Sequence, residues 1–261
     1  MFMLTILHQC SCFIKLLLSH PVRIITMIVN DQPIIFESKI IAAVSSVGDG
    51  NMKKAGMPDD LKKDVDTNRR IFLETNNIQP EQTVLVSLTY DKDNFTVYET
   101  VDEGDKGKGI MRDEAPFTDA LATSEKNVAL FLPIADCVGA IIYDLVKQAI
   151  MVSHLGRHST EQHGATKSIA YMSEKFGSKP SDILVWFSPS PGVESYPLYS
   201  FENQSLSDVN KQHFIDAGVK SENIEISSVD TSTNDEYFSY SEFRKGNRKI
   251  DGRFAVVAMI N

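Results

Sequence analysis

The sequence contains few cysteines. Only three occur in 261 residues, and two of them, Cys10 and Cys12, lie within the first dozen positions. Three thiols placed in this way do not make the disulfide framework of a secreted scaffold, and they are typical of a reducing compartment. We therefore expect a cytoplasmic protein whose folded domain carries a single cysteine, Cys137.

A surplus of basic residues is missing as well. Lys and Arg number 26 against 35 Asp and Glu, which gives a formal net charge of −9 at pH 7. This balance argues against a surface that binds nucleic acid or an anionic membrane, so we expect neither as a partner. A small anionic substrate responds to local charge only and stays compatible with the composition. The composition does not determine an oligomeric state.

Long hydrophobic runs are absent too. The segment 2–18 is apolar, but polar residues such as His8 and Lys15 interrupt it, so it is too short and too polar for a transmembrane helix. It lacks a basic start and a small-residue cleavage site, which argues against a signal peptide. We predict that residues 1–26 are an extension outside the domain and that the domain spans residues 27–261. A membrane-tethering segment is the alternative for residues 1–26.

The rest of the chain predicts one globular domain with a sizeable core, since 42% of the residues are hydrophobic and 23% charged. Short apolar segments predict strands at residues 27–30, 33–38, 40–46, 83–88, 94–99, 128–134, 138–143, 149–153, 183–187, 224–229, 237–240 and 254–260. Apolar residues at helical spacing predict helices at residues 61–76, 159–176 and 206–217. Regular βαβ alternation is absent, so we expect a mixed α/β (α+β) fold of layered helices and sheets, with antiparallel or mixed strands.

Two residue types that carry chemistry lie at neighbouring strand ends. Cys137 follows the first of three consecutive predicted strands, and His154 follows the third, just before Gly156 and a helix. Ser159 and Gln162 form a capping box that predicts the start of this helix. A thiol and an imidazole so placed should converge within about 4 Å, as a nucleophile–base pair or as two ligands of a metal ion. A buried cysteine and a histidine satisfied within the core are the alternative without a function.

The same residues carry a resemblance to a known family. Ala135-Asp136-Cys137 and Ser153-His154-Leu155-Gly156 resemble the A-D-C and H-A-G-W-R-G signatures of the laccase-domain family, also called the multicopper polyphenol oxidase-like or purine nucleoside phosphorylase family (YfiH-like). Further matches are found at residues 68–70, 119–121, 210–219, 238–240 and 252–253. The resemblance covers roughly residues 35 to 261, in the family's order, and implies the family's layered mixed-sheet domain.

The resemblance also implies an activity, the phosphorolysis of purine nucleosides such as adenosine and inosine, with adenosine deamination as a related reaction. A small purine nucleoside and phosphate are then the expected partners, and Cys137 and His154 belong to the catalytic site. In the family, these two residue types and a second His, in a Q-V-H-G segment, imply a three-ligand zinc site with an open fourth position.

This sequence departs from the family at that second His. Residues 88–91 occupy the segment, and Tyr90 stands at the position of the His. A phenol is a poor zinc ligand at neutral pH because its pKa lies near 10. We therefore expect Tyr90 in the catalytic pocket, Cys137 and His154 as the two remaining metal ligands, and zinc bound weakly or not at all. Copper is not expected, because one thiol and two imidazoles are not a multicopper set.

A second departure lies on the expected phosphate side. The Trp and Arg positions of H-A-G-W-R-G carry Arg157 and His158. An Arg near the start of a helix suits a phosphate, so Arg157, His158 and Ser159 are the expected phosphate-binding residues. His158 follows His154 by four residues and would supply a third metal ligand if this stretch were helical. The capping box at Ser159 predicts that it is not.

Two classes of function therefore stay open. The first is the purine nucleoside phosphorylase activity that the resemblance implies. The second is a divergent, metal-free member of the family, either a hydrolase with Cys137 as nucleophile and His154 as base or a binding protein without catalysis. The fold of the family resembles that of toxin deamidases that use such a dyad. Metal content and an assay with nucleoside and phosphate discriminate between the two classes.

Overall fold

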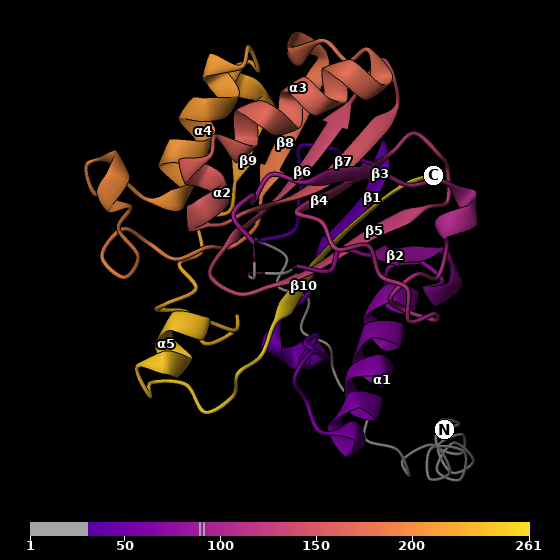
Figure 1. Cartoon of the computed structure of the whole chain (residues 1–261), viewed down its shortest axis with the longest axis vertical. Helices are drawn as coiled ribbons and strands as arrows, with labels where there is room; N and C mark the ends of the chain where they lie inside the picture. Colours follow the sequence, from indigo (N-terminus) through magenta and orange to yellow (C-terminus); the bar gives the residue numbers. More distant parts are fainter. Residues whose placement is uncertain (1–30, 89, 91) are drawn as a thin grey trace, which may run out of the picture.

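Two mixed β-sheets packed face to face form the centre of the computed structural model, which describes residues 31–88, 90 and 92–261 (Figure 1). The first sheet has the strand order β1 (Ile40–Val44), β10 (Phe254–Ile260), β5 (Ala129–Ile134) and β2 (Thr83–Leu85). The second has the order β3 (Tyr98–Thr100), β4 (Ala120–Thr123), β7 (Ala149–Leu155), β6 (Val138–Asp144), β8 (Ile183–Phe187) and β9 (Ile224–Ile226). Both sheets mix parallel and antiparallel pairs, which confirms the predicted fold class.

Helices cover the outer face of each sheet (Figure 1). Helix α1 (Asp59–Thr75) packs Phe72 and Leu73 against the four-stranded sheet. Helices α3 (Gly164–Phe176) and α4 (Leu206–Asp216) pack against the six-stranded sheet. The remaining helical segments are α2 (Arg157–Glu161), α5 (Tyr240–Arg244) and the 3₁₀ turns at Val47–Asp49, Pro80–Gln82, Glu103–Asp105, Pro180–Asp182, Tyr199–Phe201 and Ser221–Asn223. Within the described ranges, none of the helices combines the length and apolar character needed to cross a bilayer.

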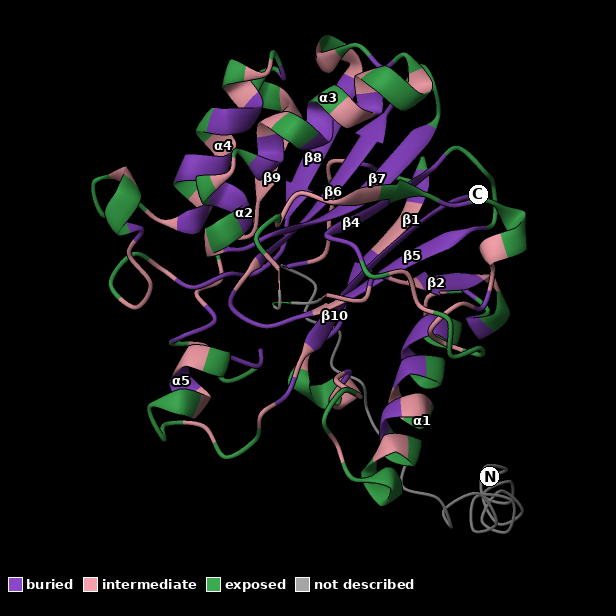
Figure 2. Cartoon of the chain, viewed as in Figure 1, coloured by how far each residue is buried: buried purple, intermediate pink, exposed green. Residues whose placement is uncertain are grey.

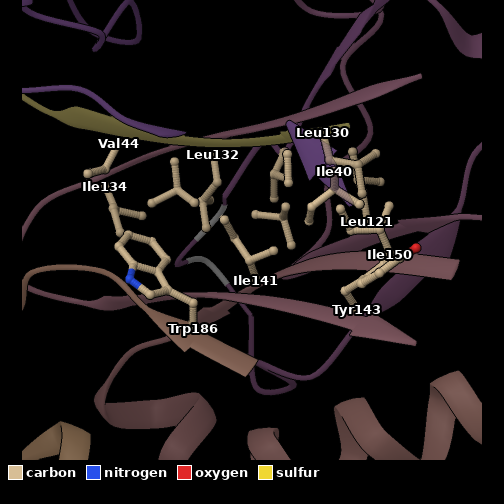
Figure 3. Close-up of a cluster of buried hydrophobic side chains, with 14 of the residues drawn as sticks. Ile40, Val44, Leu121, Leu130, Leu132, Ile134, Ile141, Tyr143, Ile150 and Trp186 are labelled. Carbon is tan, nitrogen blue, oxygen red and sulfur yellow. The ribbon is translucent and has the colours of Figure 1, made fainter. Parts of the chain in front are cut away.

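The core between the two sheets explains why several strands are apolar along their whole length (Figure 3). Leu132 and Ile134 of β5 share this core with Ile141 of β6 and Trp186 of β8. The intervening side chains face a helix layer, as Phe131 of β5 does on the side of α1. Because successive residues of a strand point to opposite faces, strands covered on both sides lose their polar alternation. Figure 2 shows the central strands buried from end to end.

Most predicted elements are confirmed. The strands expected at residues 128–134, 138–143, 149–153, 183–187 and 254–260 are β5, β6, β7, β8 and β10, and the helices expected at 61–76 and 206–217 are α1 and α4. Three further predicted strands are present but shorter, as β1, β2 and β9. The predicted strand at residues 27–30 and the predicted extension 1–26 lie outside the described residues.

The predicted strand at residues 33–38 is wrong. These residues form a turn in which Glu37 has a φ of 52°, although the side chain of Phe36 is fully buried. The segment is therefore apolar because Phe36 is buried in the core and not because the segment pairs with a sheet. Of the strand predicted at residues 94–99, only Tyr98 and Glu99 belong to β3.

The predicted strand at residues 237–240 is wrong as well. Ser239 caps helix α5, and its hydroxyl accepts a hydrogen bond from the Glu242 amide at 3.2 Å. The aromatic residues Tyr237 and Phe238 are buried ahead of this cap and gave the segment its strand-like composition.

The helix predicted from a cap at Ser159 is divided into α2 and α3, with His163 between them at a φ of 57°. Gly156 is the N-cap of α2, and Ser159 is already its third residue. The Ser159 hydroxyl accepts a hydrogen bond from the Gly156 amide at 2.8 Å. The predicted cap is therefore wrong by three residues. The Ser159 hydroxyl bonds to the amide of the preceding residue Gly156 and not to an amide of the following helical turn.

Candidate active site

A tight turn between β5 and β6 fixes the position of Cys137. Asp136 occupies the left-handed region with a φ of 66°, which reverses the chain just before the thiol. Its carboxylate accepts hydrogen bonds from the Ser241 amide at 2.5 Å and from the Thr231 hydroxyl at 3.1 Å. The turn is thereby tied to two segments that are about a hundred residues away in sequence. Cys137 is partly exposed, so its thiol is open to a ligand.

Cys137 and His154 lie together, but not because they follow neighbouring strands: β5, which ends before Cys137, belongs to the other sheet, whereas β6, which begins after Cys137, pairs with β7. Gly139 of β6 pairs with His154 of β7, which places the imidazole beside the start of β6. A Cβ atom added at Gly156 would lie 2.9 Å from Cys137 Sγ and 3.0 Å from His154 Nε2. Both reactive atoms therefore border the same small space, and only a residue without a side chain leaves that space open at position 156.

The imidazole of His154 is buried with a carboxylate on its other side. His154 Nδ1 lies 4.0 Å from Asp119 Oδ1, and the His154 amide donates a hydrogen bond to the Asp119 carbonyl at 2.8 Å. Neither ring nitrogen has a hydrogen-bond partner among the described residues. Burial by itself lowers the pKa of His154, but the interactions of the imidazole with Cys137 and Asp119 outweigh burial and raise this pKa to about 9. His154 therefore holds a proton at neutral pH.

Asp119 is a site residue that the sequence analysis used only as part of a family match. Its carboxylate is 1% exposed and accepts hydrogen bonds from Lys92 Nζ at 2.8 Å and from the Val97 amide at 3.0 Å. Burial raises the pKa of Asp119, but the interactions with His154 and Lys92 outweigh it, so this pKa lies below its ordinary value. Asp119 thus stays ionised beside His154. The family match at residues 119–121 was the available signal for Asp119.

Tyr90 lies at the same site. Its ring stands perpendicular to the His154 ring, with 6.3 Å between the ring centroids. The Tyr90 residue as a whole is 63% exposed, but desolvation and the proximity of Cys137 raise the pKa of its hydroxyl, against the opposing charge of Arg253. The phenol therefore stays neutral at ordinary pH.

Of the three predicted phosphate-binding residues, Arg157 has the most suitable position. Its guanidinium carbon lies 4.6 Å above the Tyr196 ring and 5.9 Å from the Tyr199 ring, and its Nε donates a hydrogen bond to the Tyr196 hydroxyl at 3.5 Å. Arg157 and Tyr196 both line the cavity that contains Cys137 and His154. The two tyrosines hold the guanidinium at the cavity wall without an acidic partner within salt-bridge distance among the described residues.

His158 and Ser159 also border the cavity but are engaged elsewhere. The exposed His158 ring stacks on Phe95 with centroids 4.6 Å apart. The Ser159 hydroxyl is used by backbone groups, since it accepts from the Gly156 amide and lies 3.1 Å from the His154 carbonyl oxygen, to which it donates. This geometry suits Ser159 to holding the strand end that carries His154.

The cavity above these residues is large and open, with a volume of about 1570 Å³. It extends from the Cys137–His154 pair to helix α1 and to the loop residues 109–113. Its wall also includes Tyr196, Tyr240 and Arg253, none of which the sequence analysis identified as site residues. Tyr240 and Arg253 fall in the family matches at residues 238–240 and 252–253, which were the available signal, and Tyr196 has no such match. Folding brings the three residues to one wall.

The described residues do not fit a three-ligand metal centre. Cys137 Sγ and His154 Nε2 are two suitable donors on one small space. Across residues 31–88, 90 and 92–261, no group of three or more His, Cys, Asp or Glu side chains is arranged to hold a metal ion. His158, although helical, stacks on Phe95, and Tyr90 offers a neutral phenol. This donor set therefore offers two ligands to a metal ion, one fewer than the three protein ligands of a catalytic zinc site.

Comparison with known proteins gives a consistent result. A family model described as multi-copper polyphenol oxidoreductase laccase matches residues 44–204 and 199–261. Purine nucleoside phosphorylase YlmD of Bacillus subtilis is 30% identical over 210 residues, which cover 71% of this chain and 74% of that protein. A purine nucleoside phosphorylase of Clostridium acetobutylicum is 29% identical over 145 residues, covering 49% of this chain and 61% of that protein.

Solved structures share the fold. YlmD from Geobacillus stearothermophilus superposes with a TM-score of 0.76 at 21% identity, covering 88% of this chain and 96% of that one. The hypothetical protein YfiH of Bacillus licheniformis gives a TM-score of 0.73 at 22% identity, covering 89% and 97%. The two-sheet architecture with outer helices is thus the architecture of these proteins.

Proposed function

This chain belongs to the multi-copper polyphenol oxidoreductase laccase family, and from this premise we propose that it is a purine nucleoside phosphorylase acting at the Cys137–His154 pair. Relatives named purine nucleoside phosphorylase support the class of reaction. The observation that carries the proposal is a buried imidazole that borders one space with a thiol on the wall of an open cavity, and the raised pKa of this imidazole supports it.

Phosphorolysis requires that the leaving purine is protonated and that the phosphate is held next to C1′ of the nucleoside. The C1′–N9 bond of the nucleoside breaks with its electron pair on the purine, and a phosphate oxygen forms the new bond to C1′. His154 gives its proton to a purine nitrogen as general acid, and the proton of the bound hydrogen phosphate returns to the imidazole. The products are the free base and ribose 1-phosphate. The interactions with Cys137 and Asp119 that raise the pKa of His154 support this role as a general acid.

Arg157 holds the phosphate in this proposal. A guanidinium binds phosphate through charge-assisted hydrogen bonds, and the stacking on Tyr196 and Tyr199 fixes its direction before the anion arrives. Helix α2 has only five residues, so its dipole adds little, and the side chain of Arg157 supplies most of the attraction. His158 and Ser159 act by holding neighbouring segments in place.

The test uses the purified full-length protein with adenosine or inosine, with and without phosphate. We expect phosphate-dependent release of purine base and ribose 1-phosphate, and we expect His154→Gln to abolish it. Arg157→Gln should raise the KM for phosphate more than the KM for the nucleoside. Ammonia release from adenosine measures the related deamination separately. Absence of any phosphate-dependent product from both nucleosides would overturn the proposal.

A second candidate, a cysteine hydrolase, is favoured by the order of three groups at the site. Cys137 lies on the Nε2 side of His154, and Asp119 lies on the Nδ1 side, which is the arrangement of a nucleophile, its base and an orienting carboxylate. In that case the Cys137 thiolate attacks the substrate, and a covalent intermediate is hydrolysed by water. Turnover that needs no phosphate, is lost in Cys137→Ser and is blocked by iodoacetamide would identify this chemistry.

A further inference from the structure

The cavity is larger and more basic than a nucleoside and a phosphate require. Ligand sites for small molecules usually enclose about 300–1,000 Å³, whereas this cavity has about 1570 Å³. Its lining includes eight Lys and Arg residues and four Asp residues, although the whole chain carries a formal charge of −9. Cationic side chains are therefore gathered in the cavity against the general charge of the protein, and this concentration attracts an anionic ligand.

The backbone segments that carry two of these cations, Lys53 and Arg253, are tied together by the side chain of Asn51. Asn51 Oδ1 accepts a hydrogen bond from the Lys53 amide at 2.8 Å and another from the Arg253 amide at 2.9 Å. The side chains of Lys53 and Arg253 then share a single carboxylate, Asp251. One negative charge faces two positive charges, so this cluster keeps a net positive charge beside the cavity.

The guanidinium of Arg253 is fixed and has unused donors. Its carbon lies 5.1 Å from the centre of the Tyr240 ring, and its Nη1 donates to Asp251 Oδ1 and to the Gly252 carbonyl, both at 2.7 Å. Its Nε and Nη2 donate to no acceptor in the described part of the chain. Lys53 and Arg253 line the same cavity as Tyr90 and His154. The rings of Tyr90 and His154 lie 6.3 Å apart, and the positive charge of Arg253 lowers the pKa of the Tyr90 hydroxyl, so the cluster is within electrostatic reach of the reactive pair.

We propose that Arg253 and Lys53 form a second anion subsite, separate from Arg157, and that the preferred substrate is a purine nucleoside that carries a phosphate ester. The nucleoside part reaches the Cys137–His154 pair, and the ester phosphate binds the donors of Arg253 and the ammonium of Lys53. This inference rests on the proposed phosphorolysis for the reacting end of the substrate. The subsite itself rests on the geometry of residues 51, 53 and 253.

Binding measured by calorimetry on the full-length protein, without added phosphate, tests the subsite directly. We expect adenosine 5′-monophosphate to bind about tenfold or more tightly than adenosine, which is the size of one charge-assisted hydrogen-bonded contact. Arg253→Gln and Lys53→Met should each reduce this preference by a similar factor. Thermal unfolding shows whether each variant is folded. If only one of the two variants folds, the comparison with that variant still tests the subsite.

Arg244→Gln is the matched control. Arg244 lies 6.0 Å from the same Tyr240 ring but does not line the cavity. Its replacement should leave the preference for adenosine 5′-monophosphate unchanged. Equal affinity for the two ligands in the unmodified protein, or a preference that survives both Arg253→Gln and Lys53→Met, would overturn the proposal. Inorganic phosphate is a third probe, and a subsite that binds it without preferring the ester would belong to the co-substrate and would also overturn it.

The outcome separates this inference from the proposed function. A protein that yields no ribose 1-phosphate but binds adenosine 5′-monophosphate through Arg253 would retain the subsite and lose the phosphorolysis. A protein that cleaves adenosine with phosphate but shows no preference for the ester would retain the phosphorolysis and lose the subsite.

Discussion

Asp119 and His154 interact both through their backbones and through their side chains. The His154 amide donates a hydrogen bond to the Asp119 carbonyl at 2.8 Å, and the Asp119 carboxylate lies 4.0 Å from the imidazole Nδ1. The pairing of β4 with β7 thus sets the position of a charge relative to the group whose proton it stabilises. The pairing of strands in the sheet therefore determines the distance between the carboxylate and the imidazole, and with it their electrostatic interaction.

This relationship predicts how kcat/KM depends on pH. The pKa of His154 is raised to about 9 by Cys137 and Asp119, against burial, so a step that uses the imidazolium should slow as the pH rises through about 9. Asp119→Asn removes one of the negative charges and should move this decline in kcat/KM to lower pH. The control is Asp105→Asn, which removes an outlying carboxylate paired with Lys108. An unchanged profile for Asp119→Asn would contradict the assigned role of Asp119.

Gly156→Ala should lower kcat strongly with little loss of stability. The added methyl group would lie 2.9 Å from Cys137 Sγ and 3.0 Å from His154 Nε2, so these side chains must separate. Gly156 has a φ of −93°, which any residue adopts, so the backbone itself is not strained. We expect a fall in kcat of about a hundredfold, the usual effect of displacing reacting groups by about 1 Å.

Gly48→Ala is the matched control for this change. A methyl group there meets only the Ser46 hydroxyl, at 3.3 Å, outside the cavity. Full activity of Gly156→Ala at an unchanged melting temperature would show that the space beside Cys137 and His154 is not used.

Tyr90→His should change the metal content. With Cys137 and His154 as the two suitable donors at the pair, the unmodified protein should purify with well under one zinc ion per chain. The new imidazole faces His154 and supplies a third donor, so zinc measured by elemental analysis should rise. Stoichiometric zinc in the unmodified protein that is lost in Cys137→Ala but kept in Tyr90→Phe would point to a different third ligand.

Shortened chains test where the domain begins. Gln32 exchanges two hydrogen bonds of 3.0 Å with the backbone of Val44, and Phe36 is fully buried. A chain that starts at Met27 retains both contacts and should match the melting temperature of the full chain. A chain that starts at Ser38 loses them, and burial of one Phe is worth about 3–5 kcal/mol, so its melting temperature should fall by about 10 °C or more. A clear loss on removing residues 1–26 alone would show that they pack on the domain.

The sequence predicted well those elements whose surroundings leave a local pattern. Strands β5, β6, β7, β8 and β10 are buried on both faces or nearly so, and continuous apolar runs are the direct consequence of that burial. The segments 33–38 and 237–240 were mistaken for strands because their buried aromatic and aliphatic residues fill the core from turns. Local composition records burial, and it does not record whether the backbone pairs with a neighbour.

The same distinction holds at the site. The amino-acid sequence by itself determined that Cys137 lies between two apolar strands, that Tyr90 stands where the family has a histidine, and that the domain is a layered α/β structure. The expectation that Cys137 and His154 follow neighbouring strands is wrong, because β5 and β7 belong to different sheets and His154 lies within β7. Only the tertiary structure decided that Asp119 lies beside the imidazole and that Arg253 joins Lys53 at the cavity wall. Spacing along the chain specifies which residues end a strand. Charges from distant segments meet only when the sheets pair and pack, because their interaction energy depends on distance in space and on burial.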